Sequence, residues 1–460
     1  MHSDTLKNTT KIDSKIFRAS VLFFNADPFS VTSLEKAVEY YEDGLLIIKN
    51  NHIEDVGNYE EMCEKYHLTD SNIDSSFVNK LIMPGFIDTH IHYPQTEIIG
   101  SFGEQLLPWL TKYTFPAEMK FKDTKYAEEI SKFFINELLK NGTTTALVLG
   151  TVHTESVDAI FHAADAKEMR LIAGKVMMDR NAPDGLLDTA QSSYDESESL
   201  IKKWHNHNRL LYAITPRFAP TSTPEQLLLA GALKEKYPTT YVHTHLSENS
   251  DEIAWVKSLF PEAKNYLDVY DKAGLVTSKS IFAHAIHLEA CEYDVLYKNN
   301  AVVSFCPTSN LFLGSGLFKI REMKKEGRNI RIGLGTDVGA GTSFNMIQTL
   351  NEAYKVVSLE QNGAHPRVAM SAFEGFYQAT LGGAIALSLD DKIGKLSSGY
   401  EADFVVLDFE ATALQKLRMQ RIQENKQGVL ESLSEKLFAL MMMGDDRNVV
   451  ATYVNGNKVF

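Results

Sequence analysis

The middle of the chain alternates short apolar segments with longer amphipathic ones, and this alternation limits the possible fold more than any other feature. Most of the short segments are rich in β-branched or aromatic residues, which is typical of buried β-strands. They are Phe86–His92, Thr143–Gly150, Leu171–Met178, Leu211–Phe218, Thr240–His245, Ser280–His284, Ala301–Phe305 and Ile330–Thr336. Between most of them lie stretches such as KYAEEISKFFINELLKNG, whose apolar residues recur at helical spacing before an Asn-Gly stop signal.

Eight strands that alternate with helices predict a parallel α/β fold. A closed (β/α)8 TIM-like barrel over residues 83–393 matches this number of strands. The span is longer than that of a typical barrel, so we expect insertions in the loops. The main candidate is the long loop after the first strand, from Tyr93 to about Lys122.

The two ends of the chain predict a second, smaller domain. FRASVLFFNADP and GLLIIKNNHIEDVG near the N-terminus look like strands, as do GYEADFVVLDF and ATYVNGNKVF near the C-terminus. Asn455-Gly456 between apolar alternations is a strong signal for a two-residue hairpin. We expect residues 1–82 and 394–460 to form one small β-sandwich domain, with a helical segment at 410–447 and the barrel inserted between the two parts.

Composition excludes several classes of protein. The chain has 46 basic and 60 acidic residues, a net charge of −14, which argues against nucleic acid as a partner. Its three cysteines form no CxxC motif and no disulfide framework, which fits a reducing compartment. The polar N-terminus lacks an apolar signal core, and no apolar run is long enough for a membrane helix. We therefore expect a cytoplasmic protein without a membrane partner.

Four potential metal ligands stand at the ends of predicted strands. His90 and His92 close the first strand on one face, His245 closes the fifth, and Asp337 follows the eighth. The carboxyl ends of barrel strands form the active-site face, so these side chains can point into one pocket. Three imidazoles and a carboxylate suit a catalytic zinc or ferrous ion with an open position for water.

Two further residues could move protons in such a site. Glu248 lies three residues past His245, where a general acid/base would sit, and His284 closes the sixth strand. Asp337 can double as a proton acceptor for the water. Each residue alone has an ordinary alternative: a structural His-x-His pair, a core histidine, a helix cap or a solvated glutamate. Their common position at strand ends favours the site.

Three other residues stay open. His243 shares a face with His245 and is a candidate for supporting a ligand, and His153 follows the second strand and could line the pocket. Cys306 is expected to be a buried, inert thiol.

Two motifs are missing from the sequence. It has no PCxxC, which excludes the zinc deaminase design that combines HxE with PCxxC. The fourth strand, LLYAITPRF, has no lysine to bridge two metals after carboxylation, so one metal ion is expected.

The ordered motifs PGFIDTHIH, HLSE, the strand of His284, CPTSN and GLGTDVGAG resemble the amidohydrolase superfamily. Within it, IHYPQ, LPWLTKYTFPAE, NGTTTA, TPRF, HTHLSENSDE and MGDDRNV are similar to the guanine deaminase family, from about Ala19 onward. The resemblance implies hydrolysis of guanine by water to xanthine and ammonia in purine metabolism. It also implies one Zn²⁺ per chain, with Fe²⁺ as an alternative, and a cytoplasmic homodimer.

Carried over to this sequence, the resemblance assigns a role to each site residue. The metal ligands would be His90, His92, His245 and Asp337, with Glu248 as proton shuttle and His284 orienting the hydroxide or the developing charge. The substrate would lie against His92, Gln95, Arg217, Phe218, His245, Glu248, His284 and Asp337.

The three purine-binding residues suit guanine. Arg217 offers fixed donors to a carbonyl, Gln95 offers a donor and an acceptor, and Phe218 can pack on the flat ring. Such a pocket should reject adenine, whose amine would face the donors of Arg217. For Arg217 alone, the ordinary alternative is a strand-end salt bridge.

Other functions remain open at this point. A related deaminase could act on another purine, a pterin or an s-triazine, and a non-catalytic scaffold could keep the barrel without the chemistry. The segment TEIIGSFGEQLLPW after Gln95 departs from the pattern of the family, and we expect it to form a lid.

Overall fold

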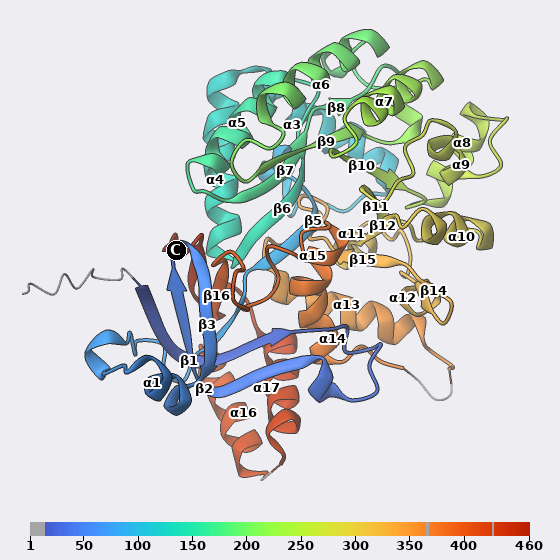
Figure 1. Cartoon of the computed structure of the whole chain (residues 1–460). Coiled ribbons are helices and arrows are strands. Elements are labelled where there is room, and N and C mark those ends of the chain that lie inside the picture. The colour runs from blue at the N-terminus through green and yellow to red at the C-terminus, as the bar shows by residue number, and fades with distance from the viewer. Residues whose placement is uncertain (1–13, 365–367, 426) are drawn as a thin grey trace, which may run out of the picture.

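The computed structural model describes residues 14–364, 368–425 and 427–460, and consists of a helix-covered barrel beside a smaller β-domain (Figure 1). The polar N-terminal residues 1–13 lie outside the described residues. The predicted (β/α)8 barrel with a small domain built from both chain ends is confirmed.

Eight parallel strands form the barrel wall in the predicted order. They are β5 (Phe86–His92), β6 (Thr143–Leu149), β7 (Arg170–Gly174), β9 (Leu210–Pro216), β10 (Tyr241–Leu246), β11 (Ser280–His284), β12 (Val302–Phe305) and β15 (Arg331–Leu334). The short β8 (Val176–Met177) pairs with the end of β9. The first and last strands meet just beyond β15, where Asp337 N donates to His90 O at 2.9 Å and His92 N donates to Val338 O at 3.0 Å. The barrel therefore closes where the predicted ligands stand.

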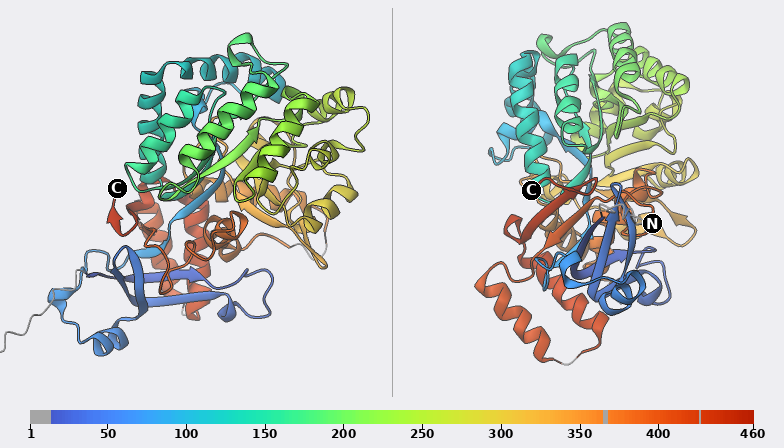
Figure 2. Two further views of the ribbon diagram at one scale, coloured as in Figure 1. Left: turned by 45° about the horizontal axis from the view of Figure 1, so that its top comes forward. Right: turned by 60° about the vertical axis from the view of Figure 1, so that its left-hand side comes forward.

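The helices that accompany the strands lie mostly on the outside of the barrel (Figure 2). They are α4 (Thr124–Lys140), α5 (Thr154–Asp165), α6 (Ala190–Trp204), α7 (Pro224–Lys236), α8 (Ser250–Leu259), α9 (Tyr266–Lys272), α10 (Ala290–Lys298), α11 (Pro307–Phe312), α12 (Ile320–Met323), α13 (Met346–Glu360), α14 (Ala372–Tyr377) and α15 (Gly383–Ala386). Helix α4 shows which local features make these segments helical. The Asp123 carboxylate caps its N-terminus by accepting from Lys125 N and Tyr126 N. Its apolar stripe, which includes Phe134 and Leu138, is buried against the strands.

The predicted insertion after the first strand folds into a chain of short helical turns. They are η3 (Tyr93–Ile98), α2 (Leu106–Trp109), η4 (Leu110–Thr114), α3 (Phe115–Glu118) and η5 (Met119–Lys122). Trp109 and Phe115 are buried in a common apolar cluster with Leu149 and Phe218. The insertion is therefore packed onto the carboxyl end of the barrel.

Both chain ends contribute to one seven-stranded sheet, in the order β18-β17-β16-β4-β1-β2-β3. Its strands are β1 (Ser14–Phe24), β2 (Val38–Lys49), β3 (His52–Asn58), β4 (Leu81–Pro84), β16 (Phe404–Leu407), β17 (Val449–Val454) and β18 (Asn457–Lys458). Strand β4 joins the two halves, because it pairs with β1 on one side and β16 on the other. The predicted hairpin at Asn455-Gly456 is present, with φ of 51° and 75° as a type I′ turn requires.

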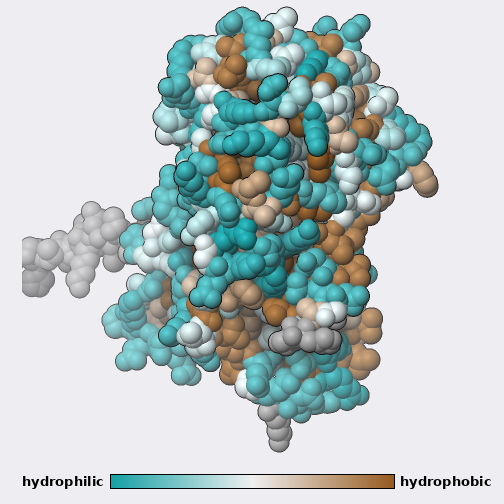
Figure 3. Space-filling model, turned by 90° about the vertical axis from the view of Figure 1, so that its right-hand side faces the viewer, coloured by the Kyte–Doolittle hydropathy of each residue, from teal (hydrophilic) through white to brown (hydrophobic). Residues whose placement is uncertain are grey.

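Three longer helices complete this part of the molecule: α1 (Tyr59–Tyr66), α16 (Ala413–Glu424) and α17 (Val429–Met443). The last two occupy the region predicted to be helical. The two-residue strands β13 (Lys324–Lys325) and β14 (Arg328–Asn329) form a separate hairpin. Hydrophilic residues cover most of the face drawn in Figure 3, with apolar residues in smaller groups between them. Among the described residues, none of the helices has the length and apolar character needed to span a bilayer.

Candidate active site

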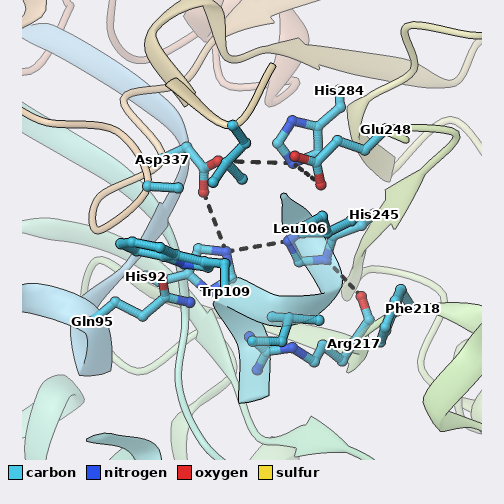
Figure 4. A pocket seen from close by; sticks show the side chains of 13 residues that line it. His92, Gln95, Leu106, Trp109, Arg217, Phe218, His245, Glu248, His284 and Asp337 are labelled. Atoms are coloured by element: carbon cyan, nitrogen blue, oxygen red, sulfur yellow. Dashed lines mark hydrogen bonds and ion pairs between the residues drawn. The ribbon is translucent and has the colours of Figure 1, made fainter. Parts of the chain in front are cut away.

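A pocket opens at the carboxyl ends of the barrel strands and gathers the residues expected to bind substrate (Figure 4). The space between and above its lining side chains is about 410 Å³. The lining includes His92, Gln95, Arg217, Phe218, His245, Glu248, His284 and Asp337, and also Leu106, Trp109, Leu110, Leu313 and Ala340. Sequence reasoning missed the last five. Leu106 and Trp109 come from the segment expected to form a lid.

Three of these polar side chains, together with His90, converge on one point at the floor. His92 Nε2 lies 3.3 Å from His90 Nε2 and 3.2 Å from His245 Nε2. Asp337 Oδ1 lies 3.2 Å from His90 Nε2 and 3.4 Å from His92 Nε2. Ligands about 2.0 Å from a tetrahedral metal are about 3.3 Å from one another, so this spacing fits a bound divalent ion.

The protonation of the histidines also fits a metal site. His245 Nδ1 lies 2.7 Å from Arg217 O and must donate to it, which leaves a lone pair on Nε2. Burial lowers the pKa of His90, His92 and His245 well below the usual value, so the imidazoles stay neutral. Neutral imidazole is the form that binds zinc or iron. His90, His92, His245 and Asp337 could therefore hold one ion.

His243 supports this cluster from behind. Its Nε2 lies 2.7 Å from His90 Nδ1, and both rings are fully buried. This is the contact that the sequence left open. By contrast, His153 does not line the pocket, and Cys306 is buried with a pKa that burial raises, as expected for an inert thiol.

Glu248 and His284 form a second pair above the four converging ligands. Glu248 Oε2 lies 3.4 Å from His284 Nε2, and Ser315 Oγ donates to Glu248 Oε1 at 3.2 Å. His284 Nδ1 donates to Asn310 Oδ1 at 2.9 Å, which sets the orientation of the ring. Burial raises the pKa of Glu248 to about 7, so this carboxyl group can both accept and release a proton near neutral pH.

The backbone at two site residues is held in the left-handed region. His284 has φ of 70° and Asp337 has φ of 53°, although neither is glycine. Such conformations are uncommon for residues with a Cβ and often occur at functional sites. Here His284 is the last residue of β11 and Asp337 follows β15, and both side chains turn into the pocket (Figure 4).

The remaining polar wall of the pocket comes from Arg217 and Gln95. Arg217 Nη1 lies 2.8 Å from each carboxylate oxygen of Glu118, and both side chains are buried. Gln95 Oε1 accepts from Gly339 N at 3.3 Å. The sequence left open whether Arg217 forms a salt bridge or lines the pocket. In the structure it does both. Sequence reasoning missed Glu118 as a site residue, although it ends the motif TFPAE.

The sequence model described as the amidohydrolase family matches residues 81–459. The chain belongs to the amidohydrolase family. Among family members, it is 55% identical to the guanine deaminase of Escherichia coli over 93% of both chains.

Two solved structures of amidohydrolases with related sequences superpose closely. Guanine deaminase from Bradyrhizobium japonicum has a TM-score of 0.93 and 38% identity, with 97% of this chain and 99% of that chain covered. Guanine deaminase from C. acetobutylicum, with guanine bound in its active site, has a TM-score of 0.84 and 31% identity, with coverage of 97% and 100%.

Proposed function

We propose that this amidohydrolase deaminates guanine hydrolytically to xanthine and ammonia. The observation that carries the proposal is the pocket itself, in which Arg217 and Gln95 form a polar wall beside the His/Asp/Glu cluster. The identity of 55% to the Escherichia coli guanine deaminase supports the same activity. The protein is a hydrolase that acts on a carbon–nitrogen bond.

The site would hold one Zn²⁺, with Fe²⁺ as the alternative, through His90, His92, His245 and Asp337. Their spacing and neutral imidazoles support this assignment. When bound there, such an ion lowers the pKa of water towards about 7 and so makes hydroxide available at neutral pH.

The proton transfers fall to Glu248 and Asp337. Glu248 takes a proton from the water, passes it to a ring nitrogen, and then supplies a proton to the amine as the carbon–nitrogen bond breaks. Its pKa of about 7 supports both roles. Asp337 accepts the second proton of the water and returns it through Glu248 to the departing amine, so that both carboxylates end the cycle ionised. His284, oriented by Asn310, stabilises the developing charge.

The wall residues would select the ring. Arg217 donates to the carbonyl of guanine, Gln95 donates to or accepts from the adjacent edge, and Phe218 packs beside the ring. An adenine amine opposite Arg217 would leave two donors facing each other in a dry pocket, which strongly disfavours that substrate.

We also propose a cytoplasmic homodimer. The resemblance to the guanine deaminase family supports both assignments, and the three free cysteines fit a reducing compartment. Light scattering on the purified protein would give the mass in solution, and a mass of one chain would contradict the dimer.

The deciding experiment is ammonia release from guanine by purified protein, with adenine and cytosine as controls and bound metal measured on the same sample. We expect ammonia from guanine alone and about one metal ion per chain. A chelator should abolish turnover, and added Zn²⁺ should restore it. Turnover of a pterin or an s-triazine instead of guanine would show that the enzyme acts on another amino-heterocycle. Absence of both metal and turnover would indicate a non-catalytic scaffold.

A further inference from the structure

Glu118 is a buried carboxylate beside the pocket to which the proposed mechanism gives no task. It ends α3 in the inserted segment, and its side chain has no exposed surface. It is not among the residues that line the pocket. Its main contact with the pocket is made through Arg217, since both of its oxygens lie 2.8 Å from Arg217 Nη1, and the neighbouring Gln95 also acts to lower its pKa.

The inserted segment holds Arg217 on two sides. Besides the Glu118 contact, the Arg217 guanidinium carbon lies 5.7 Å from the centre of the Phe115 ring on the same helix. Within the described residues, Nη1 is the one guanidinium nitrogen of Arg217 with a hydrogen-bonded acceptor. The other nitrogens therefore remain available to a substrate carbonyl.

Arg217 also connects the pocket wall with the floor. Its carbonyl oxygen accepts from His245 Nδ1 at 2.7 Å, while its side chain lines the pocket. A rotation of the guanidinium would move the donors that face the substrate. The main-chain contact with His245 does not depend on that rotation.

We propose that Glu118 is a positioning and specificity residue, which fixes the orientation of Arg217 and balances its charge. With Glu118 in place, the wall offers N–H donors but no net charge, so it favours a neutral oxo-heterocycle over an anionic one. This inference rests on the proposed function, because xanthine is a stronger acid than guanine. The neutral pair binds the substrate without holding the anionic form of the product.

The test uses the metal-loaded, full-length enzyme and the substitution Glu118→Gln, which keeps the shape and removes the charge. We expect KM for guanine to rise about tenfold, because Arg217 loses its orientation, while kcat changes little. At a pH above the pKa of xanthine, the inhibition constant of xanthine should fall relative to that KM by about tenfold. Metal content should stay as in the wild type.

A matched control is Glu97→Gln. Glu97 belongs to the same insertion and is paired with Lys120 and Tyr126, away from the pocket lining. This change should leave KM and the inhibition by xanthine unaltered. If it altered them as much as Glu118→Gln, general loosening of the insertion would explain both, and the proposal would be wrong.

A double-mutant cycle separates positioning from a merely structural role. In an Arg217→Ala background, Glu118→Gln should raise KM no further, because Glu118 acts through Arg217. Fully additive effects would overturn the proposal. If Glu118→Gln fails to fold, Glu118→Asp keeps the charge and should leave the relative binding of xanthine unchanged; tighter xanthine binding by this variant would also overturn it.

The proposed function and the proposed role of Glu118 would be contradicted by different results. A wild-type enzyme that releases no ammonia from guanine would remove the proposed function and this inference with it. An active wild type whose Glu118→Gln variant keeps both constants would overturn the inference alone.

Discussion

The two ends of strand β9 carry arginines that make very different contacts, Arg209 partly exposed and Arg217 buried. Arg209 precedes the strand, and its three guanidinium nitrogens all donate to acceptors: Glu401, Asp403 and the carbonyl oxygen of Glu168. Arg217 follows the strand and has an acceptor on one nitrogen, among the described residues, at Glu118. Both arginines are paired, but every guanidinium nitrogen of Arg209 has an acceptor, whereas Arg217 has one on a single nitrogen, among the described residues, and faces a pocket.

This difference indicates their separate uses. At the amino end, Arg209 attaches the barrel to the loop before β16 of the smaller domain, and each of its guanidinium nitrogens has an acceptor without any ligand. At the carboxyl end, Arg217 keeps donors free in a buried place, where unmet hydrogen bonds are costly. An incompletely paired buried arginine therefore points to a ligand, and a fully paired one to stability.

The largest expected effect comes from a substitution at the carboxyl end of the barrel that leaves both arginines in place. Glu248→Gln should lower kcat for guanine by about 10²- to 10⁴-fold, because the proton shuttle is removed. Fold and metal content should be unchanged. Steady-state kinetics, circular dichroism and metal analysis of one preparation check this, and activity within a few-fold of the wild type would exclude the assigned role.

Next in size is the loss of Arg209. Arg209→Ala leaves Asp403 without its ion pair, and should lower the free energy of unfolding by about 3–5 kcal/mol. KM for guanine should stay near the wild-type value at temperatures where the variant is folded. Denaturant unfolding and kinetics measure the two effects.

Arg421→Ala serves as the control for this change. Arg421 forms an exposed pair with Glu424, so its loss should cost less than about 1 kcal/mol. If Arg209→Ala raised KM strongly in the folded protein, the division between the two ends of β9 would be wrong.

Arg217→Ala should have the opposite effect to Arg209→Ala: it should lower activity strongly and stability less. We expect kcat/KM for guanine to fall about 10- to 100-fold, as for a lost hydrogen bond from a charged donor. Unfolding should change less than for Arg209→Ala, because burial already raises the pKa of Glu118 and the carboxyl group can take up a proton. Loss of the metal together with activity would make Arg217 a structural residue instead.

The smallest effect concerns pH. Burial acts to raise the pKa of Glu401, but Arg209 and Arg170 outweigh it and the pKa is lowered. A lowered folded-state pKa stabilises the protein above the unfolded-state value and loses that effect as pH falls through the folded-state value. Glu401→Gln should therefore reduce the free energy of unfolding at neutral pH, and the difference from the wild type should shrink in acid.

Unfolding at several pH values measures this difference. Glu118, whose pKa is raised by burial, should not show the same trend when replaced by Gln. If both variants gave the same pH profile, the two ion pairs would contribute to stability in the same way.

Local patterns were enough to predict the barrel. Each predicted strand has a counterpart, and β5 begins and ends at the predicted residues Phe86 and His92. The carboxyl ends of parallel strands meet on one face, so the positions of His245, Glu248 and Asp337 could be inferred without knowing any contact. The signals are strong because buried parallel strands are nearly continuous apolar runs.

The partners of these residues could not be predicted in the same way. Glu118 meets Arg217 across 99 positions of sequence, and Asn310 meets His284 across 26. Neither Glu118 nor Asn310 lies at a strand end, and a glutamate on a short helical turn is usually exposed. Their roles depend on how the insertion and the loop after β12 fold back over the barrel.

The sequence by itself therefore determined the order of strands and helices and the side chains that could reach one cup, because periodicity and chain direction are local properties. Only the tertiary structure decided that Nε2 and Oδ1 atoms lie 3.2–3.4 Å apart. It also decided that, among the described residues, all three guanidinium nitrogens of Arg209 have acceptors while one nitrogen of Arg217 does. Those facts depend on barrel closure and on the packing of distant segments. A residue's neighbours in space, unlike its neighbours in sequence, are set by the whole fold.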